Sequence, residues 1–95
     1  MNNYELALVL SAKLEDEERG AALERVKEHV TRFGGEIADI DDWGKKKLAY
    51  EIRKMDEGFY YFIHFQAEAT APAQIEAQLR IMEPVLRYLI VRQDA

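Results

Sequence analysis

The segment Trp43–Lys54 reads Trp-Gly-Lys-Lys-Lys-Leu-Ala-Tyr-Glu-Ile-Arg-Lys, and it predicts a strand that carries a concentration of positive charge. Leu48, Tyr50 and Ile52 alternate with other residues at the two-residue period of a strand that buries one face. We therefore expect these three side chains to lie in the core. Gly44 stands where the pattern starts, which indicates a bulge or a close backbone approach.

Positive charge gathers in Trp43–Lys54 although the chain as a whole is acidic. The segment holds five of the 13 basic residues and one acid, Glu51, so its net charge is +4 in a chain of formal net charge -5. Lys45, Lys47 and Arg53 are expected to project away from the core. The excess of acids argues against nucleic-acid binding by the whole surface and leaves binding by one basic patch open. The alternative is a solvated turn or strand edge whose lysines discourage aggregation.

The residues that follow predict a partner strand for this segment. Met55–Gly58 is expected to be a short turn, so a strand from about Glu36 to Lys54 and the next strand form a long hairpin. Period-two alternation sorts the second strand into a core face and an opposite face. The core face is expected to hold Phe59, Tyr61, Ile63 and Phe65, and the opposite face Tyr60, Phe62, His64 and Gln66.

Outside the hairpin, the pattern alternates between strands and helices. Leu8-Val9-Leu10 is apolar on both sides, which favours a central first strand. A helix follows, with acids in its first turn, an apolar stripe at spacings of three and four, and a stop at Gly34-Gly35. A second helix is expected to start at Thr70-Ala71-Pro72 with a capping hydroxyl and to stop at Pro84, before a last strand at Val85–Arg92.

The order of elements is therefore β-α-β-β-α-β, the ferredoxin-like or split βαβ arrangement of the α+β class. We expect both helices on one face of a four-stranded antiparallel sheet whose central strands are the first and third. A chain of 95 residues of this composition fits one domain, residues 1–95, with one modest core.

The sheet face opposite the helices is expected to carry an apolar patch. Its candidates are Tyr60 and Phe62, with neighbouring-strand residues Ala7, Val9, Leu89 and Val91. Exposed apolar patches usually mark an interface with another molecule. The alternative is that these are central-strand residues covered by long neighbouring side chains.

Residues that could support catalysis are few. Ser11 is the only serine, and no spacing joins it to His29 or His64 as a nucleophile and its base. The chain has no cysteine, so it has no thiol nucleophile and no cysteine-based zinc site. An acidic group on the hairpin is interpreted as a soluble strand edge, or alternatively as ligands for a divalent cation; it consists of Asp39, Asp41 and Asp42. We expect no catalytic residues and no cofactor.

Membrane targeting is not expected either. No apolar run approaches the length of a transmembrane helix, and Met1-Asn2-Asn3 lacks the basic start of a signal peptide.

The strand that begins at Gly44 resembles a family signature. A glycine, a basic run and then Leu-Ala-Tyr-x-Ile are similar to the second strand of the sixth protein of the bacterial small ribosomal subunit, and Tyr4-Glu5 and Val85-Leu86-Arg87 also match that family. Glu51 stands where the family often has proline. The resemblance implies a ferredoxin-like fold without enzymatic activity in a cytoplasmic, ribosome-associated protein. It further implies two partners, small-subunit ribosomal RNA in its central domain and the eighteenth small-subunit protein, and no small-molecule substrate.

These expectations assign two sets of residues. Phosphates of the RNA would be contacted by Lys45, Lys46, Lys47, Arg53 and Lys54, and more weakly by Arg87 and Arg92. The protein partner would lie on the face of Tyr60, Phe62, Val9 and Leu89. The competing hypothesis is a small ferredoxin-like enzyme or ligand-binding domain that dimerises through its sheet. It requires a pocket with convergent polar groups, which His64 and Tyr60 would begin to form.

Overall fold

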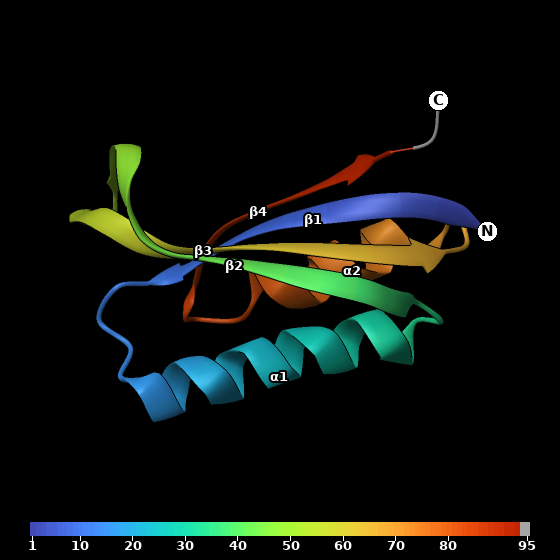
Figure 1. The fold of residues 1–95 in the computed structure, drawn as a ribbon, viewed down its shortest axis with the longest axis horizontal. Coiled ribbons are helices and arrows are strands. Elements are labelled where there is room, and N and C mark those ends of the chain that lie inside the picture. Colours follow the sequence, from blue (N-terminus) through green and yellow to red (C-terminus); the bar gives the residue numbers. More distant parts are fainter. Residues whose placement is uncertain (94–95) are drawn as a thin grey trace.

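The computed structural model describes residues 1–93 and contains six helices and strands (Figure 1). In chain order they are β1 (Asn2–Ser11), α1 (Asp16–Arg32), β2 (Glu36–Ile52), β3 (Met55–Ala67), α2 (Ala71–Arg80) and β4 (Val85–Arg92). The strands form one antiparallel sheet in the order β2-β3-β1-β4, and both helices cover the same face of it (Figure 1). The predicted ferredoxin-like fold, with the first and third strands central, is confirmed. Neither helix has the length and apolar character needed to span a membrane.

The core lies between the sheet and the two helices. β1 and β3 each send alternate side chains toward the helices, which is why both strands read as period two in the sequence. The predicted core face of β3 is confirmed, because Phe59, Tyr61, Ile63 and Phe65 are all buried. The largest fully buried side chains include Leu6, Leu8 and Leu10 of β1, Val26 and Val30 of α1, and Ile75 and Leu79 of α2.

Local sequence fixes where α1 begins and ends. At its start the side chain of Glu18 accepts a hydrogen bond from the backbone N–H of Glu15, at 3.1 Å. At its end Gly34 adopts a φ of +86°, a left-handed conformation that glycine takes without steric cost. The backbone N–H of Gly35 then donates to the carbonyl oxygen of Val30 at 2.9 Å. The predicted stop at Gly34-Gly35 is confirmed. At the start of α2, by contrast, the expected capping hydrogen bond from the Thr70 side chain is not formed.

The turn of the hairpin is not where the sequence predicts it. Ile52 pairs with Met55, so the turn consists of Arg53 and Lys54, and Met55–Gly58 already belongs to β3. Both turn residues have positive φ, +51° and +63°, as a two-residue type I′ turn requires. Such turns usually contain asparagine and glycine, and an Arg-Lys pair carries no comparable signal. The prediction of Met55–Gly58 as the turn is therefore wrong.

The end of the hairpin extends beyond the rest of the sheet. β1 pairs with β3 only from Gly58 to Ala67, so residues 48–57 overhang, and their end turns toward the face opposite the helices (Figure 1). We call residues 48–57 the hairpin tip. Its tyrosine, Tyr50, is 59% exposed, and Leu48 and Ile52 are half-buried over the open face of the sheet. The expectation that these three residues lie in the core is wrong. Alternation predicts which side chains share a face, but not whether helices cover that face.

This placement changes the expected cost of removing the Ile52 side chain. Because Ile52 is half-buried outside the core, Ile52→Ala should lower the free energy of unfolding by less than about 1.5 kcal/mol. The fully buried Leu6 provides the matched control, and Leu6→Ala should cost about 2–5 kcal/mol. Urea titrations of both variants measure the two values. Equal losses would place Ile52 in the core and contradict this description of the tip.

Candidate nucleic-acid interface

The three consecutive lysines lie on β2, an edge strand of the sheet. All three are exposed, but they do not share a face. Lys45 pairs with Phe59 and Lys46 with Gly58, and directly opposed residues point to the same side of a sheet. Lys45 therefore lies on the helix side, where its Nζ is 5.6 Å from the centroid of the Phe59 ring. Its ammonium group covers the margin of the core, which corrects the expectation that Lys45 points away from it.

The lysine run carries charge that the protein does not neutralise. Within residues 1–93, no carboxylate lies within ion-pair distance of Lys45, Lys46 or Lys47. Glu57 is opposite Lys47 in the strand register, yet the two do not form an ion pair. Three ammonium groups on an exposed edge are thus available to an anionic partner.

The other predicted basic residues are distributed over several places. Lys54 is exposed in the turn at the end of the hairpin. Arg53 donates hydrogen bonds to the backbone carbonyl oxygens of Glu83 and Val85. Arg87 and Arg92 belong to β4, the edge strand opposite β2. The guanidinium of Arg87 lies 5.7 Å from the centroid of the Tyr50 ring, and Arg92 donates to the side-chain oxygen of Asn2 at 3.0 Å. The structure brings Lys45–Lys47 together, and it does not gather all seven predicted residues on one surface.

The open face of the sheet carries the predicted aromatic side chains. Tyr60 and Phe62 point away from the core, and Leu89 on β4 is 50% exposed. Trp43 joins them: its ring centroid is 4.7 Å from that of Phe62, and the side chain is 57% exposed. The sequence did not assign Trp43 to this face, because a bulge between Asp42 and Gly44 shifts the register at that point. The predicted bulge at Gly44 is confirmed, with a φ of +73° at that residue.

Val9 behaves differently from the other predicted partner-face residues. It pairs with Tyr60 and so points to the open face, but it is only 5% exposed. The backbone of Gly58 approaches it closely, since a Cβ added to Gly58 would lie 2.5 Å from Cγ1 of Val9. Val9 is therefore part of the floor of this face, and it is not accessible in the way that Leu89 is.

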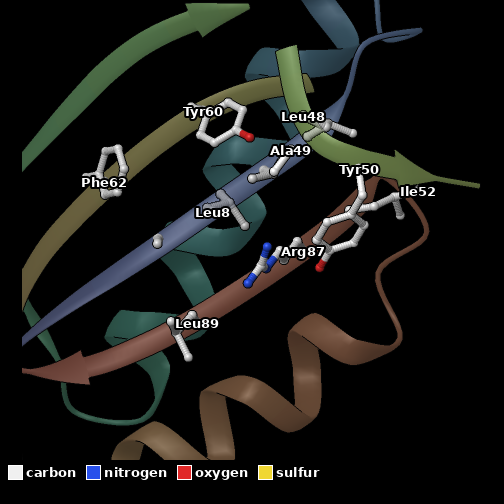
Figure 2. A pocket seen from close by; sticks show the side chains of 11 residues that line it. Leu8, Leu48, Ala49, Tyr50, Ile52, Tyr60, Phe62, Arg87 and Leu89 are labelled. Carbon is white, nitrogen blue, oxygen red and sulfur yellow. The ribbon is translucent and has the colours of Figure 1, made fainter. Parts of the chain in front are cut away.

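A shallow hollow of about 140 Å³ lies between the hairpin tip and the open face (Figure 2). Its walls are mostly apolar, and Figure 2 shows Tyr50 of the tip beside Arg87 of β4. Small-molecule sites usually have volumes of about 300–1,000 Å³ and several convergent polar groups. Tyr60 lines the hollow and His64 does not, so these two residues do not form the shared pocket that the competing hypothesis requires.

His64 instead connects three strands. Its Nε2 lies 2.9 Å from a carboxylate oxygen of Glu5 on β1, and its Nδ1 lies 2.5 Å from one of Asp39 on β2. Hydrogen bonds to Asp39 and then to Glu5 raise the pKa of His64 above its ordinary value, because they stabilise the protonated imidazole.

The three aspartates of the acidic group predicted on the hairpin have different partners. Ligand atoms of Asp39, Asp41 and His64 lie within 4.8 Å of one another, whereas Asp42 accepts a hydrogen bond from the backbone N–H of Gly44 at 2.9 Å. Asp42 is not part of the group formed by Asp39, Asp41 and His64, so the three aspartates do not converge on one point as a set of cation ligands.

The raised pKa of His64 makes stability depend on pH with a defined sign. A pKa that is higher in the folded than in the unfolded protein stabilises the fold below about pH 6.5, and this contribution is lost as the pH rises through the folded value. We therefore expect the free energy of unfolding to decrease between about pH 6 and pH 8, and His64→Gln to flatten that decrease. Urea titrations across this range measure it.

His29 supplies the control for this measurement. Burial, followed by the nearby Arg25, lowers the pKa of His29, so its contribution has the opposite sign. Because a lowered pKa affects stability around and below about pH 6.5, His29→Gln should make the decrease steeper near pH 6 and leave it unchanged near pH 8. If His64→Gln leaves the pH dependence unchanged, the two carboxylates do not stabilise protonated His64.

Fold and surface together define a class of protein: a ferredoxin-like α+β domain whose distinctive side chains are exposed charges and aromatic rings. A family model described as Ribosomal protein S6 matches residues 3–92. The chain is 45% identical over 94 residues to small ribosomal subunit protein bS6 of Caldanaerobacter subterraneus, and 43% identical over 94 residues to that of Thermoanaerobacter pseudethanolicus, with 99% of each chain covered in both cases. The crystal structure of 30S ribosomal protein S6 from Thermotoga maritima matches with a TM-score of 0.91 at 29% identity, over 97% of this chain and 87% of that one.

The chain belongs to the ribosomal protein S6 family. This confirms the resemblance of the segment that begins at Gly44. The relatives are ribosomal proteins and not enzymes, so the chain is not an enzyme, and that half of the competing hypothesis is set aside.

Proposed function

We propose that this chain is a structural constituent of the small ribosomal subunit that binds small-subunit ribosomal RNA together with the eighteenth small-subunit protein. Its site of action is then the bacterial cytoplasm, on the ribosome. Membership in the ribosomal protein S6 family supports the ribosomal role. The observation that carries the RNA contact is the exposed run Lys45–Lys47, which has no ion-pair partner within residues 1–93.

The lysines are suited to phosphate contacts that position the protein on the RNA without reading its bases. An ammonium group is a compact and mobile point charge, and phosphate contacts carry no sequence information directly. Because Lys45 and Lys46 project from opposite faces of an edge strand, the strand can present charge to phosphates on both sides of it. Lys54 extends this basic edge to the end of the hairpin. Arg87 and Arg92 are proposed as weaker contacts from the opposite edge.

The open face is proposed as the surface for the protein partner. Tyr60, Phe62, Trp43 and Leu89 are half-buried or exposed there, and aromatic side chains are enriched at the centres of protein interfaces. The half-buried Tyr60 and Phe62 leave apolar area that a partner could remove from water. Val9 supports this surface from below.

Sedimentation of a cell lysate tests the ribosomal role. The chain should travel with small ribosomal subunits, and RNase treatment before sedimentation should release it to the soluble fraction. A small-subunit protein with an established position provides the reference. Recovery of the chain in the soluble fraction without RNase treatment, while the reference sediments, would contradict the proposal.

A further inference from the structure

The hairpin tip extends beyond the end of β1, so no neighbouring strand of the sheet fixes its direction. β1 ends its pairing with β3 at Gly58, and the cross-strand pairing of the tip itself is irregular between Lys47 and Ile52. An isolated two-stranded hairpin is at best marginally stable in water. The orientation of residues 48–57 relative to the sheet must therefore come from side-chain contacts with other elements.

Arg53 makes the most direct of these contacts. Its Nη1 donates to the carbonyl oxygen of Glu83 at 2.8 Å, and its Nη2 lies 3.5 Å from the carbonyl oxygen of Val85. Glu83 lies in the connection from α2 to β4, and Val85 is the first residue of β4; they are 30 and 32 residues further along the chain. The planar guanidinium can reach two acceptors at once, which an ammonium group cannot do with the same geometry.

Two further contacts lie beside this one. The hydroxyl of Ser11, at the end of β1, is 3.3 Å from the sulfur of Met55, and the guanidinium of Arg87 lies over the ring of Tyr50. These contacts hold the two sides of the tip, and Arg53 holds its end. Both Arg53 and Lys54 are exposed, but the guanidinium of Arg53 directs two of its N–H donors at the protein's own carbonyl oxygens.

We infer that Arg53 is a positioning residue that holds the hairpin tip against the connection between α2 and β4 and so sets the direction of the basic edge. Arg53 is therefore not itself a phosphate contact, although it adjoins Lys54 in a basic segment. The consequence for RNA binding rests on the proposed function. The claim that Arg53 orients the hairpin tip does not depend on it.

Hydrogen exchange in the free protein tests the structural part. Arg53→Lys keeps the charge and the backbone preference at a positive φ, but it removes the two-pronged contact. We expect the amides of residues 48–57 to exchange about three to ten times faster in Arg53→Lys, whereas Lys54→Gln leaves them unchanged. Amides of β1 report whether the fold itself is intact. Unchanged exchange in the tip of Arg53→Lys would overturn the inference.

RNA binding distinguishes positioning from direct contact. The probe is a transcript of the central domain of small-subunit ribosomal RNA, titrated over a salt series in the presence of the eighteenth protein. If Arg53 positions the tip, Arg53→Lys and Arg53→Gln should weaken binding by a similar factor, about three- to tenfold, and keep the wild-type salt slope. Lys54→Gln should instead reduce that slope by about 0.7–0.9.

The opposite pattern would overturn the inference. If Arg53 touches a phosphate, Arg53→Lys should bind nearly as wild type, and Arg53→Gln should lose about 0.7–0.9 of slope. Failure of the wild-type protein to bind the transcript would count against the proposed function. It would leave the hydrogen-exchange result as the test of the contact between Arg53 and the carbonyl oxygens.

Discussion

Replacing Lys45, Lys46 and Lys47 together by glutamine should flatten the salt dependence of RNA binding by about two units of slope. Each phosphate contact contributes roughly 0.7–0.9 to the slope of log affinity against log salt, so three contacts account for this change. If affinity extrapolated to about 1 M salt is unaffected, binding at about 0.1 M should weaken by about a hundredfold. The measurement is a salt series with the partner protein present.

A control variant distinguishes the effect of the lysine contacts on the salt slope from the effect of lowering the overall positive charge. Arg25, Arg32 and Arg80 are exposed on the two helices, and changing them to glutamine also removes three positive charges from the protein. This control should retain nearly the wild-type slope. Circular dichroism should show the same fold in both variants, because none of the substituted side chains is buried. If the lysine variant and the wild type have the same slope, these lysines are a solvated strand edge, and the RNA surface lies elsewhere.

The second large effect is expected on the open face. Changing Tyr60 and Phe62 together to serine should weaken association with the eighteenth protein by more than about thirtyfold, since buried aromatic anchors often contribute 2 kcal/mol or more. The loss of Phe62 also removes the ring that Trp43 packs against. The midpoint of thermal unfolding should move by only a few degrees, because neither residue belongs to the core beneath the helices. Calorimetric titration and a thermal melt measure the two quantities.

Ile81 provides the matched control for this double variant. It is 77% exposed at the end of α2, on the helix side of the sheet, so Ile81→Ser removes apolar area without touching the open face. Its association with the partner should equal that of the wild type. A strongly destabilised Tyr60/Phe62 variant with unchanged association would show that the two aromatics serve the fold and not an interface.

The sequence predicted the fold well where helices cover the sheet. In β3, alternation together with apolar composition assigned Phe59 and Tyr61 to the core and Tyr60 and Phe62 to the open face, as the structure shows. Alternation is informative there because β3 is a central strand with one face under the helices. The same rule placed Tyr50 in the core and was wrong, because the hairpin tip extends beyond the paired part of β1.

Local backbone conformation explains why the sequence-based predictions misplaced the hairpin turn and did not assign Trp43 to the open face. A turn built from Arg53 and Lys54 depends on two positive φ angles that those residue types do not signal. A bulge next to Gly44 moves Trp43 to the open face, and a glycine indicates such a bulge without fixing which neighbour it displaces. The role inferred for Arg53 depends on carbonyl oxygens 30 residues away, which no pattern within the basic segment could reveal.

Binding of central-domain ribosomal RNA by this chain and the eighteenth small-subunit protein, separately and together, tests the proposed function most directly. The two proteins together should bind the transcript at least about tenfold more tightly than the eighteenth protein alone, because each contributes contacts and stabilises the other on the RNA. The advantage should shrink as salt is raised, since the lysine contacts are electrostatic. If adding this chain leaves the RNA affinity of the eighteenth protein unchanged at every salt concentration, the chain does not bind ribosomal RNA in the way proposed.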